Sequence, residues 1–265
     1  MPRRRYLMCR PTYFEVSYAI NPWMDPNTPV DGATALAQWD ELKTIYERLG
    51  HTVELIDPLP GQPDMVFAAN GALVVGGKVF GAAFKNPERA DEAPAFRSWF
   101  AGAGFIDIHT PKNVNEGEGD FAVVGDAVLA GTGFRTDHGA HLEAQEFLGR
   151  PVTSLQLVDP HFYHLDTALF VLDDTNVAYY PAAFSEGSQA VLRQLFPDAV
   201  IATEADAYAF GLNSVSDGRH VVVESGAADL IAALGEHGYE ALPIDMSELR
   251  KSGGGPKCCT QEIRV

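Results

Sequence analysis

One pattern of secondary structure recurs five times along the chain, at a spacing of about fifty residues, and no other feature constrains the fold as much. A short apolar strand is followed by two strands joined by a tight polar turn, and segments with helical spacing of apolar residues separate the hairpins. The predicted first strands span residues 53–56, 105–108, 152–157, 199–202 and 241–244. The predicted hairpins span residues 71–84, 121–134, 167–180 and 214–224, and the predicted helices span 34–49, 93–103, 141–148, 188–196 and 227–234.

The turn residues support these hairpins. Glycine, or aspartate followed by glycine, supplies the positive φ angles that two-residue hairpins require. A fifth hairpin is incomplete: its first strand would be residues 258–265, and its partner could be the N-terminal strand 6–10, which would close a ring. The pattern therefore predicts one domain over residues 1–265 with a repeat architecture rather than a doubly wound sheet. An irregular α+β domain is the alternative.

Composition limits the partners. The net charge is −17, with 36 acidic against 19 basic residues, which argues against nucleic acid because phosphate binding depends on clustered Lys and Arg. The sequence contains neither a signal peptide nor a stretch long enough to span a membrane. These observations predict a cytoplasmic protein with reduced thiols, and they leave a homo-oligomer open.

Three cysteines suggest nucleophilic chemistry. Cys258 and Cys259 are adjacent, a spacing that suits no common zinc site, and with Cys9 they are too few for a disulfide framework. If residues 258–265 form a strand, alternation places Cys258 on the polar face and Cys259 on the face of Ile263 and Val265. We therefore predict that Cys258 is a reactive thiol and that Cys259 packs in the core.

A base and several carboxylates precede other predicted strands. His164 and Asp166 lie two apart at the start of a strand, so their side chains would share a face. With His161 they could instead form a metal cluster, for which the sequence shows no fourth ligand. The run from Glu116 to Asp120 places three carboxylates in a glycine-rich turn. All these loops should reach the same end of a ring of repeats, where symmetric folds usually build a site.

Together these motifs resemble the guanidine-modifying superfamily, whose members are five-bladed α/β propellers with pseudo-fivefold symmetry (penteins). The resemblance covers essentially the whole chain. It is carried by Ile20-Asn21-Pro22-Trp23-Met24, Asp64-Met65-Val66-Phe67-Ala68-Ala69-Asn70, Glu116-Gly117-Glu118-Gly119-Asp120, His164-Leu165-Asp166, and Met246-Ser247-Glu248-Leu249 leading into Cys258.

The resemblance implies a cysteine-dependent hydrolase of a small guanidino compound, arginine or a methylarginine, with neither metal nor organic cofactor. Cys258 would attack the guanidinium carbon and His164 would be the acid and base. Glu116 would orient the histidine, with Glu118 as the rival. The substrate-binding residues implied are Asp64, Asn70, Asp120, Asp166 and Asn21, with Arg89 and Arg135 as clamps for the amino-acid carboxylate.

The residues before the first hairpin bear on which member the chain resembles. Dimethylargininases carry Glu-Asp where this chain has Ala69-Asn70, and Asn70 with Asn21 is similar to the arginine dihydrolases, which release ornithine, carbon dioxide and ammonia. Dimethylargininase and arginine deiminase are the alternatives, and an amidinotransferase is a more distant one. A non-enzymatic binder on the same fold would have no need of the nucleophile Cys258.

Overall fold

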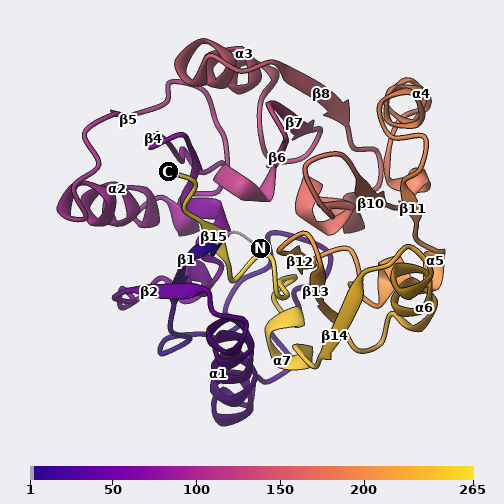
Figure 1. Cartoon of the computed structure of the whole chain (residues 1–265). Helices are drawn as coiled ribbons and strands as arrows, with labels where there is room; N and C mark the ends of the chain where they lie inside the picture. Colours follow the sequence, from indigo (N-terminus) through magenta and orange to yellow (C-terminus); the bar gives the residue numbers. More distant parts are fainter. Residues whose placement is uncertain (1–2) are drawn as a thin grey trace.

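The computed structural model describes residues 3–265 and shows five three-stranded sheets arranged around one axis (Figure 1). The sheets, each given from the axis outward, are β15 (Gln261–Glu262), β1 (Arg5–Cys9) and β2 (Thr52–Ile56); β3 (Ala72–Val75), β4 (Lys78–Gly81) and β5 (Ile108–His109); β6 (Phe121–Val124), β7 (Ala127–Thr132) and β8 (Val152–Gln156); β9 (Leu169–Val171), β10 (Val177–Tyr179) and β11 (Val200–Ile201); and β12 (Val215–Ser216), β13 (His220–Glu224) and β14 (Glu240–Ile244). This is the predicted α/β propeller of five blades.

Every blade has the same pairing. Its inner strand is antiparallel to the middle strand, and the middle strand is parallel to the outer one. The turn between β3 and β4 shows why the sequence folds this way, since Gly76 and Gly77 have φ of 57° and 76° and Val75 pairs with Lys78. The sequence prediction placed each short strand before its hairpin. In the structure that strand instead completes the preceding blade, because a parallel pair needs a helical crossover.

The ring closes at the chain termini, as predicted. Tyr6 and Leu7 of β1 pair antiparallel with Glu262 and Gln261 of β15. The C-terminal strand is shorter than predicted: Cys258 and Cys259 lie in a turn before it. The argument from strand alternation therefore does not apply to the two cysteines. Even so, Cys258 contacts the polar centre, as predicted, and Cys259 is fully buried in an apolar cluster.

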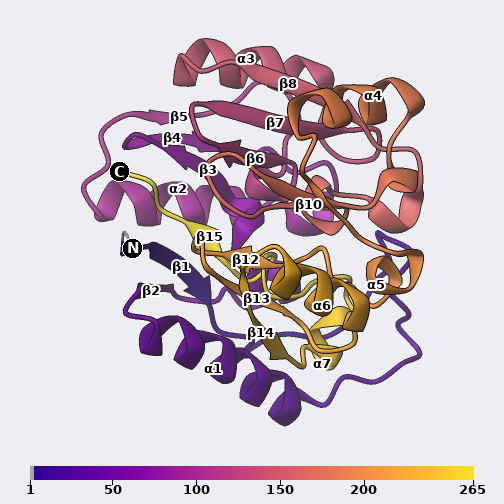
Figure 2. The same ribbon diagram turned by 45° about the vertical axis from the view of Figure 1, so that its right-hand side comes forward.

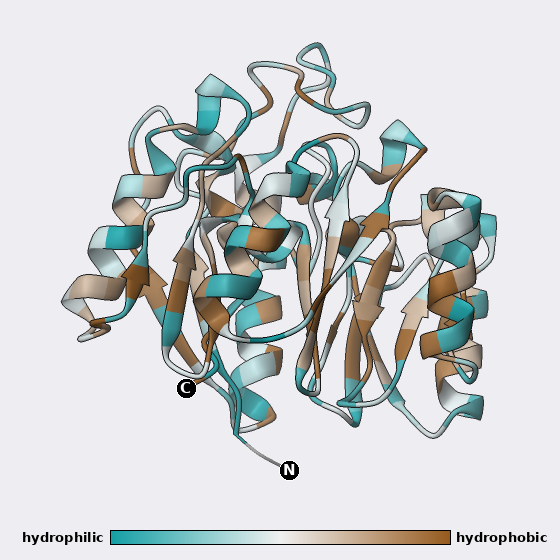
Figure 3. Ribbon diagram, turned by 90° about the horizontal axis from the view of Figure 1, so that it is seen from above, coloured by the Kyte–Doolittle hydropathy of each residue, from teal (hydrophilic) through white to brown (hydrophobic). Residues whose placement is uncertain are grey.

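The helices lie outside the sheets and bury one apolar face against them (Figures 1 and 2). The crossover helices are α1 (Gly32–Arg48), α2 (Glu92–Gly102), α3 (His138–Leu148), α4 (Glu186–Leu195) and α6 (Ala228–Glu236), close to the predicted ranges, and the two short helices α5 (Glu204–Tyr208) and α7 (Ser247–Arg250) were not predicted. Figure 3 shows the resulting pattern, with hydrophobic strands inside and hydrophilic helix surfaces outside. No helix within residues 3–265 is long and apolar enough to cross a membrane.

Candidate active site

The polar residues predicted to meet do meet, at one end of the propeller. Each precedes the inner strand of a different blade: Asn70 before β3, Glu116 before β6, His164 and Asp166 before β9, Asn213 before β12 and Cys258 before β15. Their side chains are all at most 4% exposed. The hairpin turns of the inner strands lie at the opposite end, so the two ends of the molecule have different chemistry.

Cys258 is held by partners from two other blades. Its Sγ–H donates to Asp166 Oδ2 at 3.2 Å, and Asn213 Nδ2 donates to Sγ at 3.1 Å. Asn213 Oδ1 also accepts from the Cys258 backbone N–H, so one amide fixes both ends of the residue. Burial, with the negative charge of Asp166, raises the pKa of the Cys258 thiol well above its usual range. At neutral pH the thiol of the resting protein is therefore protonated.

His164 is oriented by Glu116. Its Nε2 lies 2.7 Å from Glu116 Oε2, and the same oxygen accepts from Arg135 Nη1 at 2.7 Å. Although full burial opposes ionisation of Glu116, the charges of Arg135 and His164 lower the pKa of this carboxyl group below its usual value. The other ring nitrogen, Nδ1, is buried and has no hydrogen-bond partner within residues 3–265, so it is available to a bound molecule.

The strand prediction for this histidine was wrong in one respect. Asp166 lies in a 3-10 turn, Leu165–Thr167, which His164 directly precedes as its N-cap, and the strand β9 begins only at Leu169. The turn nevertheless brings both side chains to the centre of the site. Burial raises the pKa of Asp166 to about 6, against the lowering effect of the charge on His164, and its Oδ1 has no partner among the described residues.

The two glycines of the Glu-Gly-x-Gly-Asp motif are needed for close packing. Gly117 has φ of 52°, and a Cβ there would clash with the backbone of Ala69 and Ala72. A Cβ at Gly119 would collide with Asn70 Nδ2 and would lie 3.2 Å from the His164 ring. Gly119 therefore lets Asn70 and His164 approach the same point.

Asn70 has a fixed orientation. Its Oδ1 accepts from Arg89 Nη1 at 2.7 Å, and its Nδ2 donates to the carbonyl oxygen of Glu116 at 3.3 Å. If the amide were flipped, its NH₂ group would face the N–H donor of Arg89 and its oxygen would face the carbonyl oxygen of Glu116, and both hydrogen bonds would be lost. Arg89 is itself held by a bidentate pair with Glu92, at 2.7 and 2.8 Å.

The segment 11–30 packs against the loops at the end of the propeller that carries these residues. Tyr18 Oη donates to Asp64 Oδ2, Arg135 Nη2 donates to the carbonyl oxygen of Ile20, and Trp23 Nε1 donates to that of His161. Asn21 donates to the carbonyl oxygen of Ser252 at 3.1 Å. This segment has no helix or strand until α1, and its four partners Asp64, Arg135, His161 and Ser252 lie in four different loops.

Comparison with known proteins places the chain in a family. No protein-family model matches it. It is 54% identical over 260 residues to the N(G),N(G)-dimethylarginine dimethylaminohydrolase of Mycobacterium tuberculosis, covering 98% of this chain and 86% of that protein. This chain belongs to the guanidine-modifying superfamily, and like the relatives named here it is a hydrolase of C–N bonds.

A second group of relatives consists of longer guanidine-modifying proteins. The bifunctional arginine dihydrolase/ornithine cyclodeaminase AgrE of a Nostoc species is 36% identical over 98% of this chain, which spans only 38% of that protein. The N-terminal domain of ArgZ, solved as a mutant bound to substrate, superposes with a TM-score of 0.94 at 34% identity, over 98% of both chains.

A dimethylarginine dimethylaminohydrolase adduct, at 19% identity and a TM-score of 0.81, shares the fold.

Several predicted residues of this guanidine-modifying enzyme have other partners than expected. Glu118 pairs with Lys257 and Arg264, on the far side of the motif from His164, so Glu116 is the carboxylate beside the histidine. The two oxygens of Asp120 accept from the backbone N–H groups of Leu165 and Thr136, which anchors the turn that carries His164. That Asp120 also binds the guanidinium stays a prediction.

The sequence prediction omitted some residues of the site. Ser252 and Tyr163 were not predicted: Ser252 Oγ donates to the predicted residue Asp64 at 2.7 Å, and Tyr163 Oη donates to the carbonyl oxygen of Gly253. Asn213 is not among the predicted site residues, yet its position before β12 matches that of Asn70 before β3. That equivalence is the signal by which a repeat analysis could have included it. His161 pairs with Asp159.

Proposed function

We propose that the protein is an arginine dihydrolase, which hydrolyses the guanidino group of arginine twice and releases ornithine, carbon dioxide and ammonia. The observation that supports this is the fixed amide of Asn70. Its Nδ2 has two hydrogens, and one already reaches Glu116 O. The other can donate to the ureido oxygen of citrulline, which a carboxylate at this position would repel.

The first step is attack on the guanidinium. The Cys258 thiol is neutral at rest, so a cation bound against Asp166 both satisfies the free Oδ1 and favours the thiolate. His164 takes the thiol proton, and the sulfur forms a bond to the guanidinium carbon. The same proton then goes to one amino group, which leaves as ammonia, and a cationic thiouronium remains on Cys258.

The second step is hydrolysis. A water oxygen bonds to the thiouronium carbon and the C–S bond breaks with its electron pair returning to sulfur. One of the two water protons goes to His164, and the other restores the Cys258 thiol. Glu116 holds the imidazole ring in place for both transfers, since Nε2 is engaged and Nδ1 is free. A second round on citrulline, oriented by Asn70, would give a carbamoyl thioester and ornithine; its hydrolysis yields carbon dioxide and ammonia.

The other residues of the site position the substrate. Ser252 lies a few residues before the turn that carries Cys258. Its hydroxyl donates to Asp64 and its carbonyl oxygen accepts from Asn21, so both predicted residues are held near that turn. Arg135 uses two of its five N–H groups in contacts with Glu116 and Ile20, whereas Arg89 makes four hydrogen bonds through all three of its nitrogens. Of the two, Arg135 therefore has more donors left for a substrate carboxylate.

A second candidate is dimethylargininase. It is favoured by the 54% identity to the Mycobacterium tuberculosis protein of that name. The covalent step would be the same, but the leaving group would be dimethylamine and the product citrulline.

Product analysis separates the candidates. The protein is incubated separately with arginine, dimethylarginine and citrulline, and the products are identified by mass spectrometry. Ornithine from arginine supports the dihydrolase. Citrulline with dimethylamine selects dimethylargininase, and citrulline with ammonia selects a deiminase. No product from any of the three would refute the proposal, provided that the protein is folded.

A further inference from the structure

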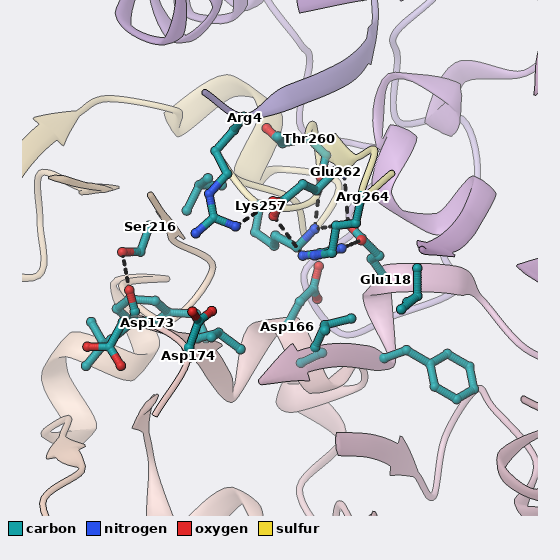
Figure 4. Close-up of a pocket in the computed structure, with 18 of the residues that line it drawn as sticks. Arg4, Glu118, Asp166, Asp173, Asp174, Ser216, Lys257, Thr260, Glu262 and Arg264 are labelled. Atoms are coloured by element: carbon teal, nitrogen blue, oxygen red, sulfur yellow. Dashed lines mark hydrogen bonds and ion pairs between the residues drawn. The ribbon is translucent and has the colours of Figure 1, made fainter. Parts of the chain in front are cut away.

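A cavity of about 260 Å³ lies on the propeller axis, behind the candidate active site. Its wall is formed by residues of all five inner strands, and its rim includes Gly76, Gly125 and Asp174 at the hairpin turns. At the other end it reaches Asp166 (Figure 4). The cavity therefore extends from the hairpin-turn end of the propeller to the carboxylate that contacts the Cys258 sulfur.

Three buried polar atoms of residues that line this cavity have no hydrogen-bond partner within residues 3–265: Asp166 Oδ1, Tyr6 Oη and Arg4 Nε. Tyr6 and Asp166 are 1% and 4% exposed. Buried polar groups almost always have a partner, from protein or from ordered water. Water takes up about 30 Å³ in the liquid, so the cavity has room for several molecules.

The inner end of the cavity is lined by ion pairs. Lys257 pairs with Glu118 at 2.6 Å, Arg4 pairs with Glu262 at 2.7 Å, and Arg264 pairs with both carboxylates. Figure 4 shows this network beside Asp166. The cavity wall also includes Asp166, and, nearer the hairpin turns, Asp173, Asp174 and Arg150. The wall is thus polar at both ends, which is the setting in which a cavity holds water.

The other end of the propeller is covered. Cys258 is 2% exposed and His164 is 1% exposed, beneath the segment 11–30, in which Tyr18 donates to Asp64 and Asn21 donates to Ser252. The axial cavity, in contrast, is open to water in the structure as it stands.

We infer that the axial cavity is a hydrated compartment that supplies the water for hydrolysis of the covalent intermediate. This inference rests on the proposed function. The water reaches the thiouronium carbon past Asp166, its oxygen forms the new C–O bond, and the C–S electrons return to Cys258. One water proton goes to His164 and the other restores the Cys258 thiol.

The test is to fill the cavity away from the chemistry. Ala122 lies on β6 and Val171 on β9, and both line the cavity. Ala122→Phe and Val171→Phe are compared with Ala122→Ser, which leaves the space open. Ammonia or amine release is followed before and during steady state, and intact-protein mass spectrometry measures the fraction of enzyme that carries the adduct.

The expected result is a first turnover at the normal rate, a kcat lower by at least about tenfold, and accumulation of the thiouronium adduct in both Phe variants, with Ala122→Ser unchanged. A normal kcat without adduct in either folded Phe variant would overturn the inference, and so would an equal slowing of both steps. If neither variant folds, a crystal structure of the unmodified protein decides: ordered water at Asp166 Oδ1 and Tyr6 Oη supports the inference, and an empty cavity refutes it. A wild-type protein inactive on every guanidine would instead count against the proposed function.

Discussion

Replacing Glu116 with glutamine tests the part of the site on which the proposed chemistry depends most. Glu116 Oε2 meets both Arg135 and His164 at 2.7 Å, and Oε1 accepts from the backbone N–H of Lys85 at 3.2 Å. Glutamine has one acceptor oxygen instead of two. In either orientation its NH₂ group faces a donor, from Arg135 or from Lys85, so at least one hydrogen bond is lost together with the charge.

The size of the effect follows from burial. Glu116 is 0% exposed and Arg135 is 5% exposed, so the change leaves a buried guanidinium without its counter-charge. Breaking such a pair costs about 3–5 kcal/mol of stability. General acid and base catalysis by a well-placed group contributes about 10²–10⁴ to the rate, and we expect kcat to fall within that range because His164 loses its orientation. This fall corresponds to roughly 3–5 kcal/mol in the activation barrier.

A matched control separates stability from catalysis. Asp217 is also a buried carboxylate beside imidazoles, at 3.2 Å from His51 and 2.9 Å from His220, but it lies at the hairpin turn of β12 and β13, away from the site. Urea denaturation should show both Glu116→Gln and Asp217→Asn to be destabilised, whereas steady-state ammonia release should fall only in Glu116→Gln. The reasoning is wrong if folded Glu116→Gln keeps more than about a tenth of kcat, or if the control loses as much activity.

Three further predictions concern the nucleophile, the acid limb and the product. Cys258→Ser should lose turnover and show no adduct by intact-protein mass spectrometry; turnover of arginine by this variant would eliminate the covalent mechanism. Because the pKa of Asp166 is raised to about 6, its carboxylate is neutralised as the pH falls below that value, and kcat/KM should fall about tenfold per pH unit there; a profile flat through pH 6 to about pH 4 would contradict this role. Asn70→Asp should shift the product from arginine toward citrulline, measured as the ratio of ornithine to citrulline, and an unchanged ratio would remove the reason for choosing the dihydrolase.

The periodicity of the sequence was sufficient to predict the ring. Paired glycines at the turn after β3, and apolar segments of strand and helix length in alternation, are local properties that do not depend on distant contacts. The same locality explains the error in grouping the strands. Which hairpin an isolated strand joins depends on the helical crossover, and β2 pairs with β1 rather than with the hairpin that follows it in sequence.

The sequence, through its resemblance to the guanidine-modifying superfamily, also predicted Cys258, His164 and Glu116 as the principal site residues, and the structure places each of them before the inner strand of a different blade. Their partners were decided only by the tertiary structure. Asp120 and Glu118 are chemically as suitable as Glu116, yet backbone N–H groups occupy the first and two cations the second. Which of several neighbouring carboxylates meets an imidazole depends on ångström-scale packing between blades distant in sequence, and no local pattern encodes it.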